Sequence, residues 1–165
     1  CSMAKCEALC IREFCDGDVD IVVALIHRTI DACYTRAYPP RAVEFFKRFH
    51  SREGILERSR KGTILVVERD GAVIGTGALV DHEIYGVFVE PELQGGGIGR
   101  AIMGELERRA AAAGRDHVAL SVSLPSRRFY EVLGYEILHE AFIDVGEGQR
   151  LDYWEARKPL QPEAE

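Results

Sequence analysis

The chain has 165 residues, of which 47% are hydrophobic and 29% are charged, and its formal net charge is −6. This composition predicts one folded domain with a substantial core and argues against a disordered chain. The acidic balance argues against nucleic acid as a partner. The longest apolar run near the N-terminus, Ile21–Ile26, is too short to span a membrane, so we expect no membrane partner and a cytoplasmic location.

Five cysteines fall in the first fifth of the chain: Cys1, Cys6, Cys10, Cys15 and Cys33. Their odd number and irregular spacing argue against a disulfide framework. We expect reduced thiols and no metal, with a metal site among Cys6, Cys10 and Cys15 as the less favoured alternative.

Hydrophobic periodicity and turn residues predict seven strands and four helices in a single domain, 1–165. Strands are predicted at Ala8–Phe14, Thr63–Glu68, Ala72–Val80, Glu83–Glu90, His117–Val122, Tyr135–Ile143 and Leu151–Lys158. Helices are predicted after an Asp18 cap, over Ala42–Phe49, after a glycine cluster and over Pro125–Leu133. Gly54 is expected to interrupt the second helical pattern. The core covers about residues 9–158, between a short N-terminal extension and a C-terminal tail.

The glycine cluster joins a strand to a helix and predicts an anion site. Residues 94–100 read QGGGIGR, and apolar residues at helical spacing follow them. The first turn of a helix has unpartnered N–H groups and the positive end of the helix dipole, and glycines let a ligand approach closely. A dinucleotide fingerprint is excluded because Arg100 or Ile102 stands where its third glycine belongs, and no Walker A spacing is present.

The spacing that remains is Q-x-x-G-x-G, filled by Gln94, Gly97 and Gly99. Here the chain resembles the GNAT superfamily of N-acetyltransferases, whose Q/R-x-x-G-x-G/A motif binds the pyrophosphate of acetyl-CoA between a strand and a helix. The preceding VFVEPELQ is also typical of that family. The alternative is an ordinary strand-turn-helix with a glycine-rich cap.

A second segment strengthens the resemblance. Residues 126–135 read SRRFYEVLGY, which is similar to the A-x-x-F-Y-x-x-x-G-F segment of the family, with Ser126 and Tyr135 as departures. The family often has Asn seven residues before the Tyr, where this chain has Ser123, whose hydroxyl can still form hydrogen bonds. The resemblance implies an α/β (α+β) GNAT fold, with a mixed, mostly antiparallel seven-stranded sheet flanked by about four helices.

The resemblance also implies acetyl-CoA as co-substrate, bound without a metal. The pantetheine arm would pair with the fourth strand where this strand splays from the fifth, and Gly86 is consistent with a bulge just before that point. The N–H of Val89 or a neighbour would meet the oxyanion, and Arg100 would lie beside the phosphates. The implied binding residues are Val87, Phe88, Val89, Gln94, Gly95, Gly96, Gly97, Ile98, Gly99, Arg100, Ser123, Ser126, Phe129 and Tyr130.

Acetyl transfer to an amine needs an acid for the leaving thiolate and a route for the amine proton. Tyr130 matches the family tyrosine near the CoA sulfur and is the candidate acid. Glu83 is the candidate base, because it lies eleven residues before Gln94, the offset of the catalytic Glu in the histone acetyltransferase branch. Burial beside Ile84 and Tyr85 would make it a stronger base. His82 and an ordered water are the alternatives.

The predicted function is therefore acetyl-CoA-dependent transfer to a primary amine of a small molecule or peptide, by direct attack in a ternary complex. A catalytically silent CoA-binding regulatory module is one alternative. An acyltransferase for protein amines or for a larger acyl group is another. A homodimer is a possible assembly.

A basic stretch gives a hint about the acceptor. Residues 34–61 contain eight Lys and Arg residues and three Glu residues, a net charge of +5 in an acidic chain. In the family this region forms much of the acceptor wall, so Arg36, Arg41 or Arg48 could hold an amine that also carries a carboxylate or phosphate. A solvated basic helix surface is the alternative.

Overall fold

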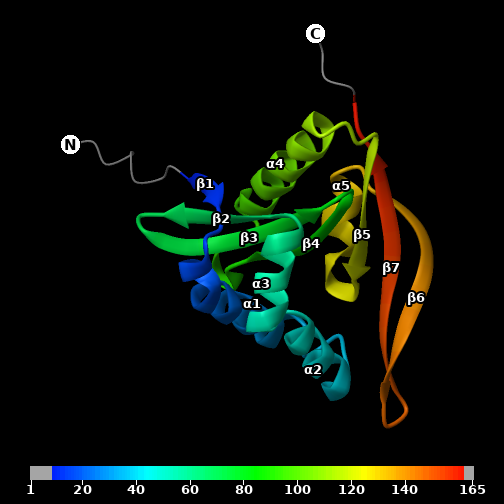
Figure 1. Ribbon diagram of the computed structural model, residues 1–165. Helices are drawn as coiled ribbons and strands as arrows, with labels where there is room; N and C mark the ends of the chain where they lie inside the picture. Colours follow the sequence, from blue (N-terminus) through cyan, green and yellow to red (C-terminus); the bar gives the residue numbers. More distant parts are fainter. Residues whose placement is uncertain (1–8, 162–165) are drawn as a thin grey trace.

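The computed structural model describes residues 9–161, which form one seven-stranded sheet with five α-helices (Figure 1). The strands are β1 (Cys10–Glu13), β2 (Thr63–Arg69), β3 (Ala72–Val80), β4 (Glu83–Val89), β5 (His117–Ser123), β6 (Glu136–Gly146) and β7 (Gln149–Pro159). The helices are α1 (Val19–Cys33), α2 (Pro40–Phe49), α3 (Arg52–Lys61), α4 (Ile98–Ala112) and α5 (Arg127–Val132). Within residues 9–161 the spatial order is β1-β2-β3-β4-β5-β7-β6, and only β4 and β5 pair in parallel. The predicted mixed, mostly antiparallel sheet is confirmed.

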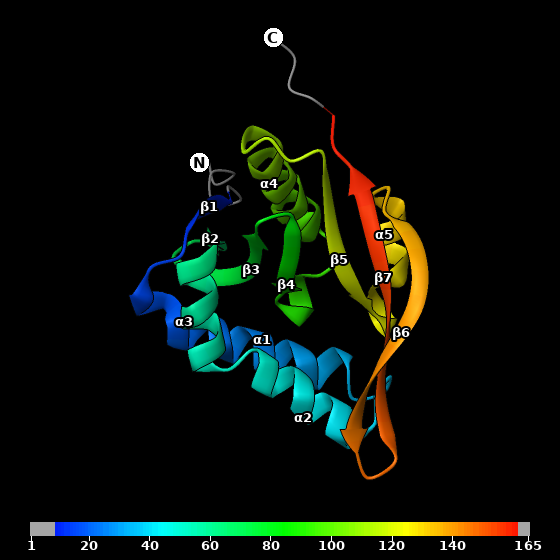
Figure 2. The same ribbon diagram turned by 45° about the vertical axis from the view of Figure 1, so that its right-hand side comes forward.

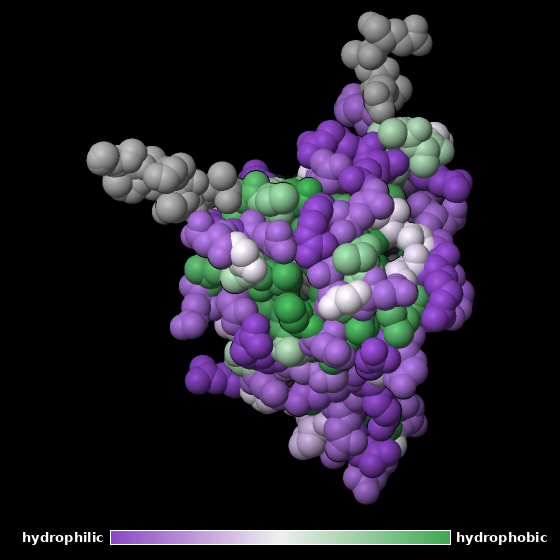
Figure 3. Space-filling model, turned by 60° about the vertical axis from the view of Figure 1, so that its left-hand side comes forward, coloured by the Kyte–Doolittle hydropathy of each residue, from purple (hydrophilic) through white to green (hydrophobic). Residues whose placement is uncertain are grey.

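Helices cover both faces of the sheet because its central strands are apolar on both sides. Side chains alternate between the faces of a strand. Accordingly, Leu65 and Val67 of β2 join the core under α4, whereas Ile64 and Val66 join the core under α1. Figure 2 shows α1, α2 and α3 gathered on one side of the sheet and α4 on the other. On the face seen in Figure 3, hydrophobic residues lie across the middle, with hydrophilic residues above and below.

The structure has five α-helices where about four were predicted, because α3 follows α2 closely. Gly54 lies in the first turn of α3, where its N–H donates to the Ser51 hydroxyl at 3.1 Å. A glycine at this position does not end a helix, since the cap satisfies an N–H that has no partner within the helix. The inner side of α3 buries Ile55 and Arg58. The buried side chain of Arg58 therefore lies on the side of α3 that faces the sheet.

The sheet opens between β4 and β5. These two strands pair only at Glu83 and Ala119, whereas β5 pairs with β7 along its whole length. β4 in turn stays paired with β3 through a bulge, in which Gly86 and Val87 lie opposite Gly77. Gly86 has φ +58°, a left-handed conformation that favours glycine. The predicted splay and the predicted bulge at Gly86 are both confirmed.

Hydrogen bonds connect the start of α2 to the β6–β7 hairpin. The Tyr38 hydroxyl donates to the Asp152 carbonyl at 2.7 Å and accepts from the Leu124 N–H at 2.9 Å. Arg41 Nε donates to the Val145 carbonyl at 2.8 Å, and its backbone N–H donates to the Gln149 side chain at 2.9 Å. The hairpin is thus held as one wall beside the opening of the sheet.

Two expectations concern the chain as a whole. Cys10, Cys15 and Cys33 are free thiols, as predicted, while Cys1 and Cys6 lie outside the described residues. Among residues 9–161, no helix is both long and apolar enough to cross a membrane.

Candidate active site

The opening between β4 and β5 contains two adjoining cavities. The larger, about 370 Å³, is called the aromatic cavity because Phe45, Phe46, Phe49, Tyr85, Phe88 and Tyr153 line it. The smaller, about 270 Å³, is called the glycine cavity because Gly95 and Gly99 line it at the start of α4. Five residues line both cavities: Tyr34, Val87, Phe88, Ser126 and Tyr130. The two cavities therefore meet at this set of side chains.

The backbone at the start of α4 is shaped to receive an anion. Gly95 and Gly97 have φ +85° and +93°, and Gly97 is the residue that caps the helix. A Cβ at Gly99 would lie 3.0 Å from the Phe129 ring, so a side chain here would have to displace this ring. The first N–H groups of α4 have no partner within the helix, which favours a negatively charged ligand.

Gln94 holds the turn that links β4 to α4. Its side-chain amide donates to the Val89 carbonyl at 3.0 Å. The Glu90 N–H donates to the Ile74 carbonyl of β3 at 2.9 Å. Successive N–H groups of a strand point to opposite sides, so the Val89 N–H points away from β3 and towards the opening.

The structure brings most of the predicted binding residues to the two cavities. Those that line the glycine cavity are Val87, Phe88, Val89, Gln94, Gly95, Ile98, Gly99, Ser126, Phe129 and Tyr130. Ser123 lines the aromatic cavity, and its hydroxyl lies 2.7 Å from that of Ser126. Gly96, Gly97 and Arg100 line neither cavity, although all three belong to the turn and the first turn of α4.

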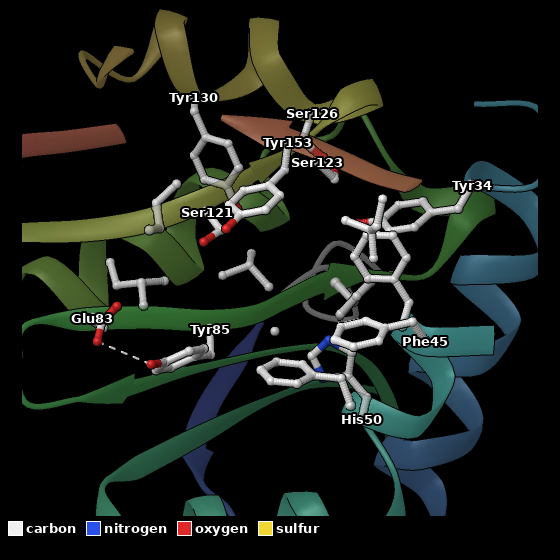
Figure 4. A pocket seen from close by; sticks show the side chains of 18 of the residues that line it. Tyr34, Phe45, His50, Glu83, Tyr85, Ser121, Ser123, Ser126, Tyr130 and Tyr153 are labelled. Atoms are coloured by element: carbon white, nitrogen blue, oxygen red, sulfur yellow. Dashed lines mark hydrogen bonds between the residues drawn. The ribbon is translucent and has the colours of Figure 1, made fainter. Parts of the chain in front are cut away.

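Tyr130 lies where the two cavities meet. Figure 4 shows its ring reaching into the aromatic cavity from α5, with Glu83 and Tyr85 across the cavity. The residue is only 8% exposed, and burial, with a smaller effect of the nearby Tyr34, raises the pKa of its phenol. The phenol therefore stays protonated at neutral pH and can act as a proton donor.

The structure places the two candidate bases, Glu83 and His82, differently relative to the cavities. Glu83 lines the aromatic cavity, and Tyr85 donates a hydrogen bond to its carboxylate at 3.2 Å. The expected burial of Glu83 is wrong, because it lies exposed at the first residue of β4, where the cavity opens. His82 does not line either cavity and contacts Asp81 at 2.9 Å and the His117 ring.

A buried pair, His50 and Arg58, stands beside the aromatic cavity and was not predicted from the sequence. His50 follows the last residue of α2 and lines the cavity, with Arg58 Nη1 3.3 Å from its Nδ1. Burial, followed by the charge of Arg58, lowers the pKa of His50 to about 3. The one sequence signal for this pair is Gly86, because a Cβ there would lie 2.8 Å from Arg58 Nη1.

The arginines proposed for the acceptor wall do not line the aromatic cavity. Arg41 is engaged with the β6–β7 hairpin, and Arg48 lies near Glu44 on the same helix at 3.9 Å. Arg36 is exposed after the end of α1. The wall that this segment provides is aromatic, made by Phe45, Phe46 and Phe49 because α2 turns these rings towards the opening.

No group of three or more His, Cys, Asp or Glu side chains in the described part of the chain could hold a metal ion. The polar groups that line the cavities are hydroxyls, backbone amides, the Gln94 carboxamide, the Cys33 thiol, one carboxylate and one imidazole.

Comparisons with known proteins agree with this architecture. The acetyltransferase (GNAT) family model matches residues 24–135. Among solved structures, a GCN5-related N-acetyltransferase from Rhodopseudomonas palustris superposes with a TM-score of 0.85 at 18% identity, covering 93% of this chain and 97% of its own. The paiA N-acetyltransferase of Thermoplasma acidophilum, in complex with coenzyme A, gives 0.74 at 19% identity over 92% and 99%.

A third structure, yncA of Salmonella typhimurium with its cofactor acetyl-CoA, gives a TM-score of 0.67 at 18% identity over 96% of this chain and 98% of its own. At these identities the similarity establishes the fold. No curated protein matches the sequence.

The neutral state of buried His50 predicts a dependence of stability on pH. The folded pKa is about 3, against 6.5 for an ordinary histidine. As pH falls below 6.5, the unfolded chain takes up a proton that the folded chain does not, so stability is lost. Urea unfolding should show this contribution falling by roughly 2 kcal/mol between pH 8 and pH 5.

His50→Gln supplies the comparison, because glutamine does not titrate. The difference in free energy of unfolding between wild type and His50→Gln should shift by that amount across the same pH range. A difference that stays constant with pH would show that His50 is not held neutral in the folded protein.

Proposed function

Because this chain belongs to the acetyltransferase (GNAT) family, we propose that it transfers an acetyl group from acetyl-CoA to a primary amine of a small molecule or peptide. The observation that carries the proposal is the meeting of the two cavities at Tyr130. The glycine cavity would hold the donor, and the aromatic cavity would hold the acceptor. Donor and acceptor would then lie in contact, as direct transfer in a ternary complex requires.

The residues of the glycine cavity fit acetyl-CoA. The free N–H groups at the start of α4 suit a pyrophosphate, and the unpaired edge of β4 suits an amide-containing arm that adds like a strand. When bound, acetyl-CoA supplies an acetyl group activated as a thioester. Ser123 and Ser126 add hydroxyls near the junction.

Two groups of the protein would then act on the thioester. The Val89 N–H points into the opening and would donate to the carbonyl oxygen as it becomes negative. The Tyr130 phenol would protonate the departing sulfur, because its pKa is raised and it remains neutral. A bond forms between the amine nitrogen and the acetyl carbon, and the carbon–sulfur bond breaks.

Glu83 would remove the proton that the amine loses, directly or through a water. Its carboxylate lines the aromatic cavity, whereas the imidazole of His82 lies outside it. The exposure of Glu83 favours transfer through water, since solvent reaches this end of the cavity. Proton uptake at Glu83 and proton release at Tyr130 leave the net proton balance unchanged.

The donor site is tested by a charge placed at the start of α4. Gly99→Glu should abolish binding of acetyl-CoA measured by calorimetry, because the new carboxylate would crowd Phe129 and repel the pyrophosphate. Gly104→Glu is the matched control on the same helix, where the nearest group is Arg108 at 3.7 Å, and it should bind normally. If Gly99→Glu binds acetyl-CoA as tightly as Gly104→Glu, the glycine turn is not part of the donor site.

The acid is tested by removing one hydroxyl. Tyr130→Phe should lower turnover by about 10²- to 10⁴-fold, the range typical of a general acid, while the affinity for acetyl-CoA changes little. Single-turnover kinetics separates the chemical step from product release. Wild-type turnover in the variant, measured when chemistry limits the rate, would exclude Tyr130 as the acid.

The base is tested through the pH profile of turnover. Glu83→Gln should remove the limb in which activity falls at acidic pH, and His82→Gln, the matched change outside the cavity, should retain it. Persistence of that limb in Glu83→Gln would mean that the acceptor amine or another group titrates instead.

A further inference from the structure

The lining of the aromatic cavity is mostly apolar and carries a single formal charge. Among its lining residues only Glu83 is a carboxylate, and no lysine or arginine is present. Eight Phe and Tyr rings and five aliphatic residues, Leu120, Ile143 and Leu151 among them, form most of the remaining surface. Burial of an apolar group against such a surface is favourable, in proportion to the area removed from water.

His50 places one hydrogen-bond donor in this apolar wall. A guanidinium can only donate, so the contact from Arg58 makes Nδ1 of His50 an acceptor and leaves the ring proton on Nε2. Within residues 9–161, Nε2 of His50 has no hydrogen-bond partner. This atom is also not fully buried. His50 is 4% exposed and lines the cavity, so this N–H is open to the cavity space.

Arg58 adds a positive charge behind His50. Its guanidinium lies 5.4 Å from the Phe49 ring centre and 5.5 Å from that of Tyr85. None of the ion pairs in the described part of the chain includes Arg58, which is 9% exposed. Burial lowers its pKa to about 10, so it is still cationic at neutral pH. The charge makes this end of the cavity favourable for an oxygen that carries partial or full negative charge.

The two ends of the cavity differ in their chemistry. Figure 4 shows Tyr130 and Tyr153 on one side and His50 on the opposite side, with Glu83 beyond Tyr85. The amine would lie near Tyr130, where the cavities meet. The Nε2–H of His50, which would bind an oxygen, lies across an apolar space from the amine.

We infer that the acceptor is a small primary amine that carries an aromatic or branched apolar group and a carbonyl or carboxylate oxygen, which the Nε2–H of His50 binds. Apolar amino acids and their amides have this chemistry. The inference rests on the proposed function and deepens it by naming the substrate class. A small molecule is favoured over a polypeptide because the cavity is about 370 Å³ and the start of α2 is bound to the β6–β7 hairpin beside it.

The test compares acceptors that differ by one group, with kcat/KM measured from thiol release and calculated for the concentration of unprotonated amine, because a neighbouring carbonyl group lowers the pKa of an amine. L-Phenylalaninamide should exceed phenethylamine, which lacks the carbonyl, by about tenfold, the effect of one hydrogen bond. It should exceed glycinamide, which lacks the ring, by more than about tenfold. The tripeptide Phe-Gly-Gly should be no better than the amide, and a tenfold advantage for the tripeptide would overturn the small-molecule class.

The variants are judged by the ratio of phenylalaninamide to phenethylamine, which is independent of the fraction of active protein. His50→Phe should bring this ratio close to one, and His50→Gln, whose side-chain amide can still donate, should keep part of the preference. Arg58→Met should lower the ratio through loss of the fixed tautomer, which gives a second route if His50→Phe does not fold. Arg48→Ala removes an exposed charge from the same segment and should leave the ratio unchanged.

The experiment distinguishes failure of this inference from failure of the proposed function. Equal kcat/KM for phenylalaninamide, phenethylamine and glycinamide, or a ratio that persists in His50→Phe, would overturn this inference and leave the proposed acetyl transfer intact. Absence of transfer to every amine, with acetyl-CoA still bound, would overturn the proposed function itself.

Discussion

The site depends on the separation of β4 from β5. β5 pairs along its whole length with β7 and β4 stays paired with β3, but β4 and β5 pair with each other only at Glu83 and Ala119. Backbone groups in the middle of a sheet are normally paired, and leaving them free is costly unless a ligand or water satisfies them. The edge of β4 that faces β5, and with it the Val89 N–H, is thus left available for a ligand. The cavities on the two sides of Tyr130 occupy the space that this separation creates.

The bulge in β4 links this backbone feature to the helices on one face of the sheet. Gly86 takes a left-handed conformation, and the absence of a side chain there leaves room for Arg58. Arg58 in turn fixes the hydrogen position on His50, which lines the aromatic cavity. A single residue of β4 therefore affects both the free edge of this strand and the wall of the aromatic cavity. A side chain at position 86 would disturb both, because its Cβ would strain the backbone of the strand and would also crowd Arg58.

The sequence predicted the features that depend on local pattern. Strand alternation gave the sheet, and the glycines at 95, 97 and 99 predicted the turn before α4, because left-handed backbone and close packing leave few other residues. α3 was missed because Gly54 in a first turn looks the same in sequence as Gly54 in a break. The expected burial of Glu83 was wrong because Glu83 is the first residue of β4, next to the turn at residues 81–82, and its apolar neighbours in sequence do not show which side of the strand is covered. Arg58 could not be distinguished from the other basic residues of 34–61, because only the packing of α3 on the sheet shows which of them is buried.

The central claim is that the two cavities form one reaction site, in which an acetyl group passes from acetyl-CoA to an amine. Its most direct test is to incubate the protein with acetyl-CoA and an amine panel, and to measure free thiol and acetylated amine in the same samples by mass spectrometry. The account predicts that both products appear together in equal amounts and only when protein, acetyl-CoA and an amine are all present. Bound acetyl-CoA with no acetylated amine from any member of the panel would contradict it and would indicate a CoA-binding module without transfer activity.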